Sequence, residues 1–141
     1  MSPTPQLLVY LAGPIDMADE DDRRQWRAQA KRLLQAQGHG TFDPAMPFEF
    51  PSSPVRTKEQ AERILAINTA AIMLCDGLLA YLGDGRIPTL GTPIEIVEAL
   101  RLKKKVACFG GPPKSLYVRT WPHHPTLEDA VTALTFVPDE C

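Results

Sequence analysis

The sequence predicts an α/β fold built on one parallel sheet. Short apolar runs that end in glycine or proline alternate along the chain with longer segments whose apolar residues recur at helical spacing. Such alternation is typical of right-handed βαβ units, in which helices cover both faces of a parallel sheet. With 141 residues the chain is long enough to bury a core, and we expect a single domain over residues 1–141.

The first part of the chain is expected to form two strands around one helix. Residues 6–12 (QLLVYLA) are a compact apolar run stopped by Gly13 and Pro14, which suits a fully buried strand. Residues 20–37 carry acidic residues at the front and apolar residues at helical spacing, so they predict an amphipathic helix. A short second strand is expected within residues 39–44 (HGTFDP).

The middle of the chain combines a loop, a helix and a strand. Residues 44–56 hold four prolines and two phenylalanines, and we expect a loop that lies over a pocket. Thr57 and Gln60 have the spacing of a capping box, which predicts a helix from there through about residue 74. Residues 76–82 (DGLLAYL) are the expected third strand.

The last part of the chain is expected to complete the sheet. A glycine-rich loop at residues 83–91 leads into a helix from Pro93 to about Lys103, with proline at the first helical position. Residues 105–110 (KVACFG) predict the fourth strand, and residues 115–121 (SLYVRTW) are interpreted as a fifth. A final short helix is expected at residues 126–134. For these five strands we predict the flavodoxin-like or Rossmann-like order 2-1-3-4-5, as a three-layer sandwich.

The composition and charge favour a small substrate or partner and exclude several classes of function. Hydrophobic residues make up 44% and charged residues 23%, which is the globular range. The net charge of −2 gives no basic field for a nucleic acid polymer or an anionic membrane. The three cysteines are far apart and lack CxxC spacing, so we expect free thiols and a cytoplasmic location. No apolar stretch resembles a signal peptide or a membrane span.

Parallel sheets of this kind bind ligands beyond the carboxyl ends of their strands, where the strand order reverses. The sequence places no dinucleotide or P-loop motif there, and no Ser–His or Cys–His pair. Carboxylates remain: Glu95 with Asp16, Asp76 and Asp84 in reach of this rim. Each aspartate also has a purely structural interpretation, as a helix cap, an acceptor for backbone N–H groups and a turn residue respectively.

Glu95 itself has two interpretations. Thr92-x-x-Glu95 matches a capping box, in which the glutamate would satisfy a backbone N–H at a helix start. A carboxylate after a glycine-rich loop at the mouth of a parallel sheet could instead be a nucleophile.

An ordered set of motifs resembles the nucleoside 2-deoxyribosyltransferase family. It comprises VYLAGPID, Trp26, FDP, INTAAIMLCDGLLAYL and GTPIEIVEAL…KKKVACFG, and it covers about residues 8–110. The resemblance implies that Glu95 is the nucleophile: it attacks the anomeric carbon, releases the base and forms a glycosyl ester. A second base or water then resolves the ester. The resemblance implies no metal or organic cofactor. It implies a homodimer or a larger homo-oligomer in which neighbouring subunits complete each other's sites.

One departure from the family concerns acid catalysis. Family members commonly carry an aspartate eight residues before the position of Asp76, and this chain has Asn68 there. An amide can bind a sugar hydroxyl or a base but cannot be a general acid. Either Asp16, Asp84 or water would then protonate the leaving base, or the leaving base is a good one. Alternatively, Asn68 is a satisfied amide on a helix face.

A second departure concerns the substrate. At the position of Thr89, transferases of the family tend to have an aspartate that binds the sugar 5′-hydroxyl. The related monophosphate N-glycosidases have a serine at this position. Backbone N–H groups at Gly91 and Thr92 could cradle an anion, and Ser115 falls where family members reach a neighbouring subunit's site. Asp16 argues against a substrate with a 5′-phosphate, because the monophosphate hydrolases have a basic residue at this position.

Transfer of a deoxyribosyl group from a nucleoside to a free nucleobase is therefore the expected function. Hydrolysis of a nucleoside 5′-monophosphate is the alternative, and a catalytically silent nucleotide-sensing module is an alternative of another class. Tyr10 could stack on a base or be a core residue with a bonded hydroxyl. The expected catalytic residues are Glu95, Asn68 and Asp84. The expected substrate contacts are Gly13, Pro14, Asp16, Phe48, Asp76, Thr89, Gly91, Thr92 and Ser115.

Overall fold

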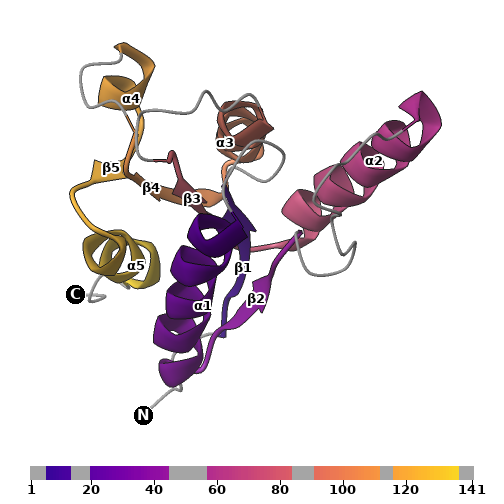
Figure 1. Cartoon of the computed structure of the whole chain (residues 1–141). Coiled ribbons are helices and arrows are strands. Elements are labelled where there is room, and N and C mark those ends of the chain that lie inside the picture. Colours follow the sequence, from indigo (N-terminus) through magenta and orange to yellow (C-terminus); the bar gives the residue numbers. More distant parts are fainter. Residues whose placement is uncertain (1–5, 14–19, 45–56, 84–90, 112–115, 137–141) are drawn as a thin grey trace.

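The computed structural model describes residues 6–13, 20–44, 57–83, 91–111 and 116–136. They contain a five-stranded parallel sheet in the order β2-β1-β3-β4-β5, which confirms the predicted order (Figure 1). The strands are β1 (Leu8–Ala12), β2 (Gly40–Phe42), β3 (Gly77–Tyr81), β4 (Lys105–Phe109) and β5 (His123–His124).

The helices cover both faces of this sheet. They are α1 (Glu20–Ala36), α2 (Lys58–Leu74), α3 (Gly91–Arg101), α4 (Leu116–Thr120) and α5 (Leu127–Thr135). Helices α1 and α5 pack on one face and α2 and α3 on the other, each around its own buried apolar cluster (Figure 1). Because side chains alternate along a strand, β1 sends Val9 and Leu11 to the first cluster and Tyr10 and Ala12 to the second.

The predicted fifth strand at residues 115–121 is wrong. Residues 116–120 form the short helix α4, and the fifth strand is instead the dipeptide His123–His124, which pairs with Cys108 and Phe109 of β4. Valine and aromatic residues made 115–121 read as a strand, yet Val118 is buried in the α2–α3 cluster from a helix. A two-residue strand between prolines has no alternation that sequence could reveal.

The starts of α2 and α3 differ in how closely they match the predictions. The capping box of α2 is confirmed: the Gln60 amide donates to the Thr57 hydroxyl over 3.1 Å, and the Thr57 amide donates to the Gln60 side chain over 3.0 Å. Helix α3, in contrast, begins at Gly91 rather than at the predicted Pro93. Pro93 is tolerated as the third helical residue because N–H groups of the first turn have no intrahelical partner.

The carboxyl ends of β3 and β4 are joined by glycines. The Gly111 amide donates to the Gly83 carbonyl over 2.8 Å, and Gly110 adopts a left-handed φ of 76°. A Cβ on Gly110 would lie 2.8 Å from the Gly83 oxygen and 2.8 Å from the Tyr81 ring. Only glycine fits this close approach, so backbone contacts hold the carboxyl ends of β3 and β4 together.

Candidate functional site

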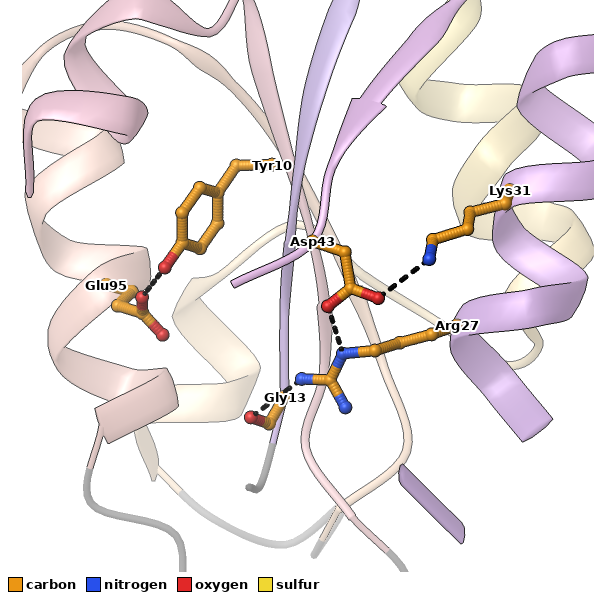
Figure 2. Close-up of polar contacts among 6 residues, drawn as sticks. All are labelled: Tyr10, Gly13, Arg27, Lys31, Asp43 and Glu95. Atoms are coloured by element: carbon orange, nitrogen blue, oxygen red, sulfur yellow. Dashed lines mark hydrogen bonds and ion pairs between the residues drawn. The ribbon is translucent and has the colours of Figure 1, made fainter. Parts of the chain in front are cut away.

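A buried tyrosine–glutamate pair lies where β1 faces α3. Tyr10 is 0% exposed, and its hydroxyl donates a hydrogen bond to Glu95 Oε2 (Figure 2). The alternation of β1 directs Tyr10 toward α3, and its ring stacks on Phe42 of β2 with centroids 5.6 Å apart. The tyrosine is therefore held between Phe42 and Glu95, and it fixes one carboxylate oxygen of Glu95.

The pair has unusual acid–base properties. Burial raises the pKa of Glu95 from 4.5 to about 7, although the Tyr10 hydrogen bond and the positive charge of Arg27 both act to lower it. Burial, followed by the negative charge of Glu95, raises the pKa of Tyr10 above its ordinary value. Tyr10 is therefore a neutral donor. Glu95 is a carboxylate poised near neutral pH, as expected of a nucleophile or a base.

The capping-box interpretation of Glu95 does not fit this geometry. A cap residue must precede the helix, whereas Thr92 lies inside α3 and is only 2% exposed. Thr92 packs on the buried side of α3 with Ile96 and Ala99. The Glu95 carboxylate is directed instead to β1, as Figure 2 shows.

A second polar group lies on the α1 side of β1, and we call Arg27, Lys31 and Asp43 the ionic triad. Asp43 follows β2 and is buried, with Oδ1 3.2 Å from Arg27 Nε and Oδ2 2.9 Å from Lys31 Nζ (Figure 2). The Nε contact is an ion pair rather than an aligned hydrogen bond. Arg27 Nη2 also donates to the Gly13 carbonyl over 3.2 Å.

Gly13 itself is required by its neighbour Trp26. A Cβ at Gly13 would lie 2.5 Å from the Trp26 ring. The same ring contacts Tyr81 and Phe109, with centroids 5.6 and 5.9 Å away, and the Arg27 guanidinium lies 4.7 Å from its centroid. An aromatic cluster on the α1–α5 face of the sheet thus packs against the carboxyl ends of β1, β3 and β4.

Asn68 is half-buried on α2, and its Oδ1 is buried without a hydrogen-bond partner. The interpretation of Asn68 as a satisfied amide therefore fails for the carbonyl oxygen. Buried acceptors without donors are uncommon, so this oxygen is available to a donor that the described residues do not provide.

Gly91 is exposed at the start of α3.

Asp76 lies at the wrong edge of the sheet for the predicted contact. It precedes β3, so it sits at the amino ends of the strands, whereas Glu95 lies toward the carboxyl ends. Its Oδ2 accepts the Leu8 amide over 2.8 Å, and its own amide donates to the Leu8 carbonyl over 2.8 Å. Asp76 thus joins β1 to β3, which was its alternative interpretation as an acceptor for backbone N–H groups.

The remaining predicted residues lie outside the described residues: Pro14, Asp16, Phe48, Asp84, Thr89 and Ser115. The expected loop at residues 44–56 lies outside them too, apart from Pro44, which is buried.

Sequence reasoning missed the partner of Glu95 and the ionic triad. For Tyr10 the sequence leaves open a base-stacking residue or a core residue with a bonded hydroxyl, and strand alternation could have placed it on the same face as the helix of Glu95. For the ionic triad, the available signal was the position of Arg27. A charged residue directly after the buried Trp26 lies at the buried edge of its helix, which indicates that it needs a buried partner.

Beside the site, α2 and α3 expose large apolar side chains on several sides of the two helices. Eight large apolar side chains of the described residues lie there at 38–78% exposure: Leu65, Ile67, Met73, Leu74, Ile94, Val97, Leu100 and Leu102. Residues 64–74 carry no charge at all, although much of this stretch is exposed. A helix that is apolar on most sides is normally buried.

Two other kinds of site are absent from the described residues. They contain no group of three or more histidine, cysteine, aspartate or glutamate side chains that could hold a metal ion. Within the same ranges, no helix has the length and apolar character needed to span a membrane.

Comparison with known proteins identifies relatives. The family model described as nucleoside 2-deoxyribosyltransferase matches residues 9–118. The structure is similar to that of a 2-deoxyribosyltransferase from Bacillus psychrosaccharolyticus, with a TM-score of 0.68, 22% identity and coverage of 86% of this chain and 88% of that one. No curated protein sequence matches significantly.

Two further solved structures share the fold. A 2-deoxyribosyltransferase from Leishmania mexicana has a TM-score of 0.58 and 22% identity, over 90% of this chain and 77% of that one. A CMP N-glycosidase from Clostridium botulinum has a TM-score of 0.57 and 18% identity, over 90% of this chain and 97% of that one. At these identities the likenesses establish the fold alone.

Proposed function

The chain belongs to the nucleoside 2-deoxyribosyltransferase family, and from that membership we propose that it moves a deoxyribosyl group between nucleobases. The substrate would be a 2′-deoxyribonucleoside, and the acceptor a free base. The observation that carries the proposal is the buried Tyr10–Glu95 pair, because it presents a fixed carboxylate whose pKa lies near neutrality.

In the first step, a Glu95 oxygen attacks the anomeric carbon of the sugar. The C–N bond breaks, its electron pair stays on the base nitrogen, and a proton from Asp84, Asp16 or water completes the leaving base. Tyr10 holds Oε2, so the attacking oxygen is Oε1. A close carboxylate stabilises the oxocarbenium character of such a transition state and then captures it.

In the second step, a ring nitrogen of the acceptor base attacks the same carbon and expels Glu95 as a carboxylate. The new C–N bond replaces the ester, and the acceptor nitrogen returns one proton to the group that protonated the leaving base in the first step. With water as the acceptor, the same step is hydrolysis. The Tyr10 hydroxyl stabilises the departing carboxylate in this step, since its hydrogen bond favours the charged form.

Substrate binding would use groups at the carboxyl edge. The unpartnered Oδ1 of Asn68 supports a role as acceptor for a sugar hydroxyl or a base N–H group. The N–H group of Gly91 fits either a 5′-hydroxyl or a 5′-phosphate, because α3 begins at this residue. The Thr92 side chain is buried and is not part of this proposal.

Chromatography of reaction mixtures tests the function. The protein is incubated with deoxynucleosides and their 5′-monophosphates, each with and without a free base. We expect a new nucleoside only when the base is present. Release of free base from monophosphates alone would show that the protein is a hydrolase rather than a transferase. Stabilisation against unfolding by a ligand, without turnover, would indicate a sensor. Glu95→Gln is the matched control, because it preserves size and removes the nucleophile.

A second copy of the chain would cover part of the apolar surface of α2 and α3. At their exposed fractions the eight side chains present on the order of 800 Å² of apolar surface, spread over several sides of the helices, and a standard interface buries about 800 Å² on each partner. A monomer of ordinary kind exposes smaller apolar patches. Because Ile94 precedes Glu95, a homodimer formed through this surface would bring the partner subunit next to the site. A cytoplasmic role in nucleoside salvage completes the proposal.

A further inference from the structure

Phe42 is an aromatic residue at the edge of the sheet that the proposed reaction does not use. In the described sheet β2 is the last strand at one edge, and Phe42 is the last residue of β2. Its side chain is only half-buried, against the α2–α3 cluster. Such a ring removes less apolar surface from water than a fully buried one. Its place beside Tyr10 points to a role in the Tyr10–Glu95 pair.

Phe42 and Tyr10 are direct neighbours on adjacent strands. The register of β1 and β2 pairs Tyr10 with Phe42, and both side chains lie on the α2–α3 face of the sheet. Their ring centroids are 5.6 Å apart and their planes differ by 14°. On the other flank, the register of β1 and β3 pairs Tyr10 with the aliphatic Leu78. Phe42 is thus the strand neighbour that presents a flat surface to the Tyr10 ring.

The end of β2 is itself fastened to α1. Asp43 follows Phe42 directly, and its carboxylate lies on the α1 side of the sheet (Figure 2). This carboxylate is 3.2 Å from Arg27 Nε and 2.9 Å from Lys31 Nζ. The short edge strand is therefore held on one face by Asp43 and on the other face by the stacked rings. These contacts keep the Phe42 ring in place against Tyr10.

The Tyr10 side chain carries this placement to Glu95. Its hydroxyl, at the far end of the ring from the backbone, donates the hydrogen bond to Glu95 Oε2. A change in the χ1 angle of Tyr10 would displace this hydroxyl more than the ring atoms nearer the backbone. Hydrogen bonds weaken steeply as their angle departs from linearity. The neighbour that restricts the Tyr10 ring therefore controls how well this hydrogen bond is aligned.

We propose that Phe42 is a positioning residue that acts on Glu95 through Tyr10. Its ring holds the Tyr10 ring in the orientation that directs the hydroxyl at Oε2 and leaves Oε1 for the sugar. The consequence for turnover rests on the proposed role of Glu95, whereas the effect on the hydrogen bond does not.

A titration of Glu95 tests the inference without any substrate. The protein is labelled with glutamate carrying ¹³C at the side-chain carboxyl, and the Glu95 resonance is assigned by its loss in Glu95→Gln. Phe42→Met keeps most of the side-chain volume and removes the flat ring. Because the Tyr10 hydrogen bond lowers the pKa of Glu95, we expect the midpoint to move to higher pH by about 0.3 unit or more. Phe42→Tyr retains the ring and should retain the wild-type midpoint.

Phe109→Met is the matched control. Phe109 also ends a strand, and it also stacks on a tyrosine: its ring centroid is 5.0 Å from that of Tyr81, with planes 23° apart. This pair packs on the opposite face of the sheet, in the α1–α5 cluster. Phe109→Met therefore removes a similar stacked ring without touching Tyr10. We expect the Glu95 midpoint of this variant to equal that of wild type.

A double variant shows whether Phe42 acts through the Tyr10 hydroxyl. Tyr10→Phe alone should raise the Glu95 midpoint, because it removes the hydrogen bond. Adding Phe42→Met to Tyr10→Phe should give no further shift, since the group that connects Phe42 to Glu95 is already gone. With substrate, kcat should fall about threefold or more in Phe42→Met and should not fall further when this change is added to Tyr10→Phe.

Three results would overturn the inference: equal midpoints in wild type and Phe42→Met, an equal shift in Phe109→Met, or a further shift in the double variant. If Phe42→Met did not fold, Phe42→Leu would take its place with the same expectations. An absence of turnover in the wild-type protein would refute the proposed function, while the titration would still decide the role of Phe42.

Discussion

Glu95 is the residue at which stability and proposed function oppose each other. Its folded pKa is about 7, against 4.5 for an unperturbed glutamate. The stability associated with this group is fully present below pH 4.5, where the carboxyl is protonated in both states. It is lost as the pH rises through 7, because the buried group must then ionise. The loss amounts to about 3 kcal/mol above that range.

Replacing Glu95 by glutamine should therefore stabilise the fold at alkaline pH. We expect Glu95→Gln to be more stable than wild type by roughly 1–3 kcal/mol at pH 8 and equal to it near pH 4. Urea unfolding at both pH values measures the difference. Lower stability of the variant at pH 8 would instead indicate that Glu95 is mainly a structural acceptor.

Tyr10 offers a finer test of the same pair. Tyr10→Phe keeps the ring that stacks on Phe42 and removes only the hydroxyl that Glu95 accepts. Because this hydrogen bond lowers the pKa of Glu95, we expect the acidic limb of kcat/KM to move to higher pH and the rate to fall. A pH–rate profile of the variant decides; superimposable profiles would show that the hydroxyl does not act on the nucleophile.

At the scale of elements, α2 carries Asn68 at the position where the resemblance to the family implies an aspartate. We expect Asn68→Asp to accelerate release of poor leaving bases, because it adds a proton donor that the amide lacks. Single-turnover rates with good and poor leaving bases measure the effect, and Asn68→Ala is the control for loss of the side chain. An unchanged or lower rate in Asn68→Asp would mean that the amide acts as a binding group.

The elements also show what the sequence could and could not predict. β1, β3 and β4 were readable because a central parallel strand is a continuous apolar run, and α2 because Thr57 and Gln60 mark its start. β5 was not, because two histidines paired with β4 carry no periodicity. For the site, motif spacing singled out Glu95. The Tyr10 and Arg27 contacts depend on which sheet face and which strand end each residue reaches in three dimensions.

At the scale of the whole molecule, the exposed apolar side chains of α2 and α3 predict self-association. We expect a homodimer by sedimentation analysis, and we expect Leu65→Glu with Leu74→Glu to give a monomer, because two charges cannot be buried in an apolar interface. Phe136→Glu is the matched control: Phe136 is 64% exposed, as is Leu65, but it follows α5 on the other side of the sheet. A wild-type monomer at micromolar concentration would refute the proposed interface.

The central claim is that Glu95 forms a covalent bond to the sugar. Its most direct test is mass spectrometry of protein that is quenched in acid during turnover and then digested. We predict a deoxyribosyl adduct on the peptide that contains Glu95 and no adduct or turnover in Glu95→Gln. Wild-type turnover in Glu95→Gln, or a sugar attached to any other residue, would contradict the account.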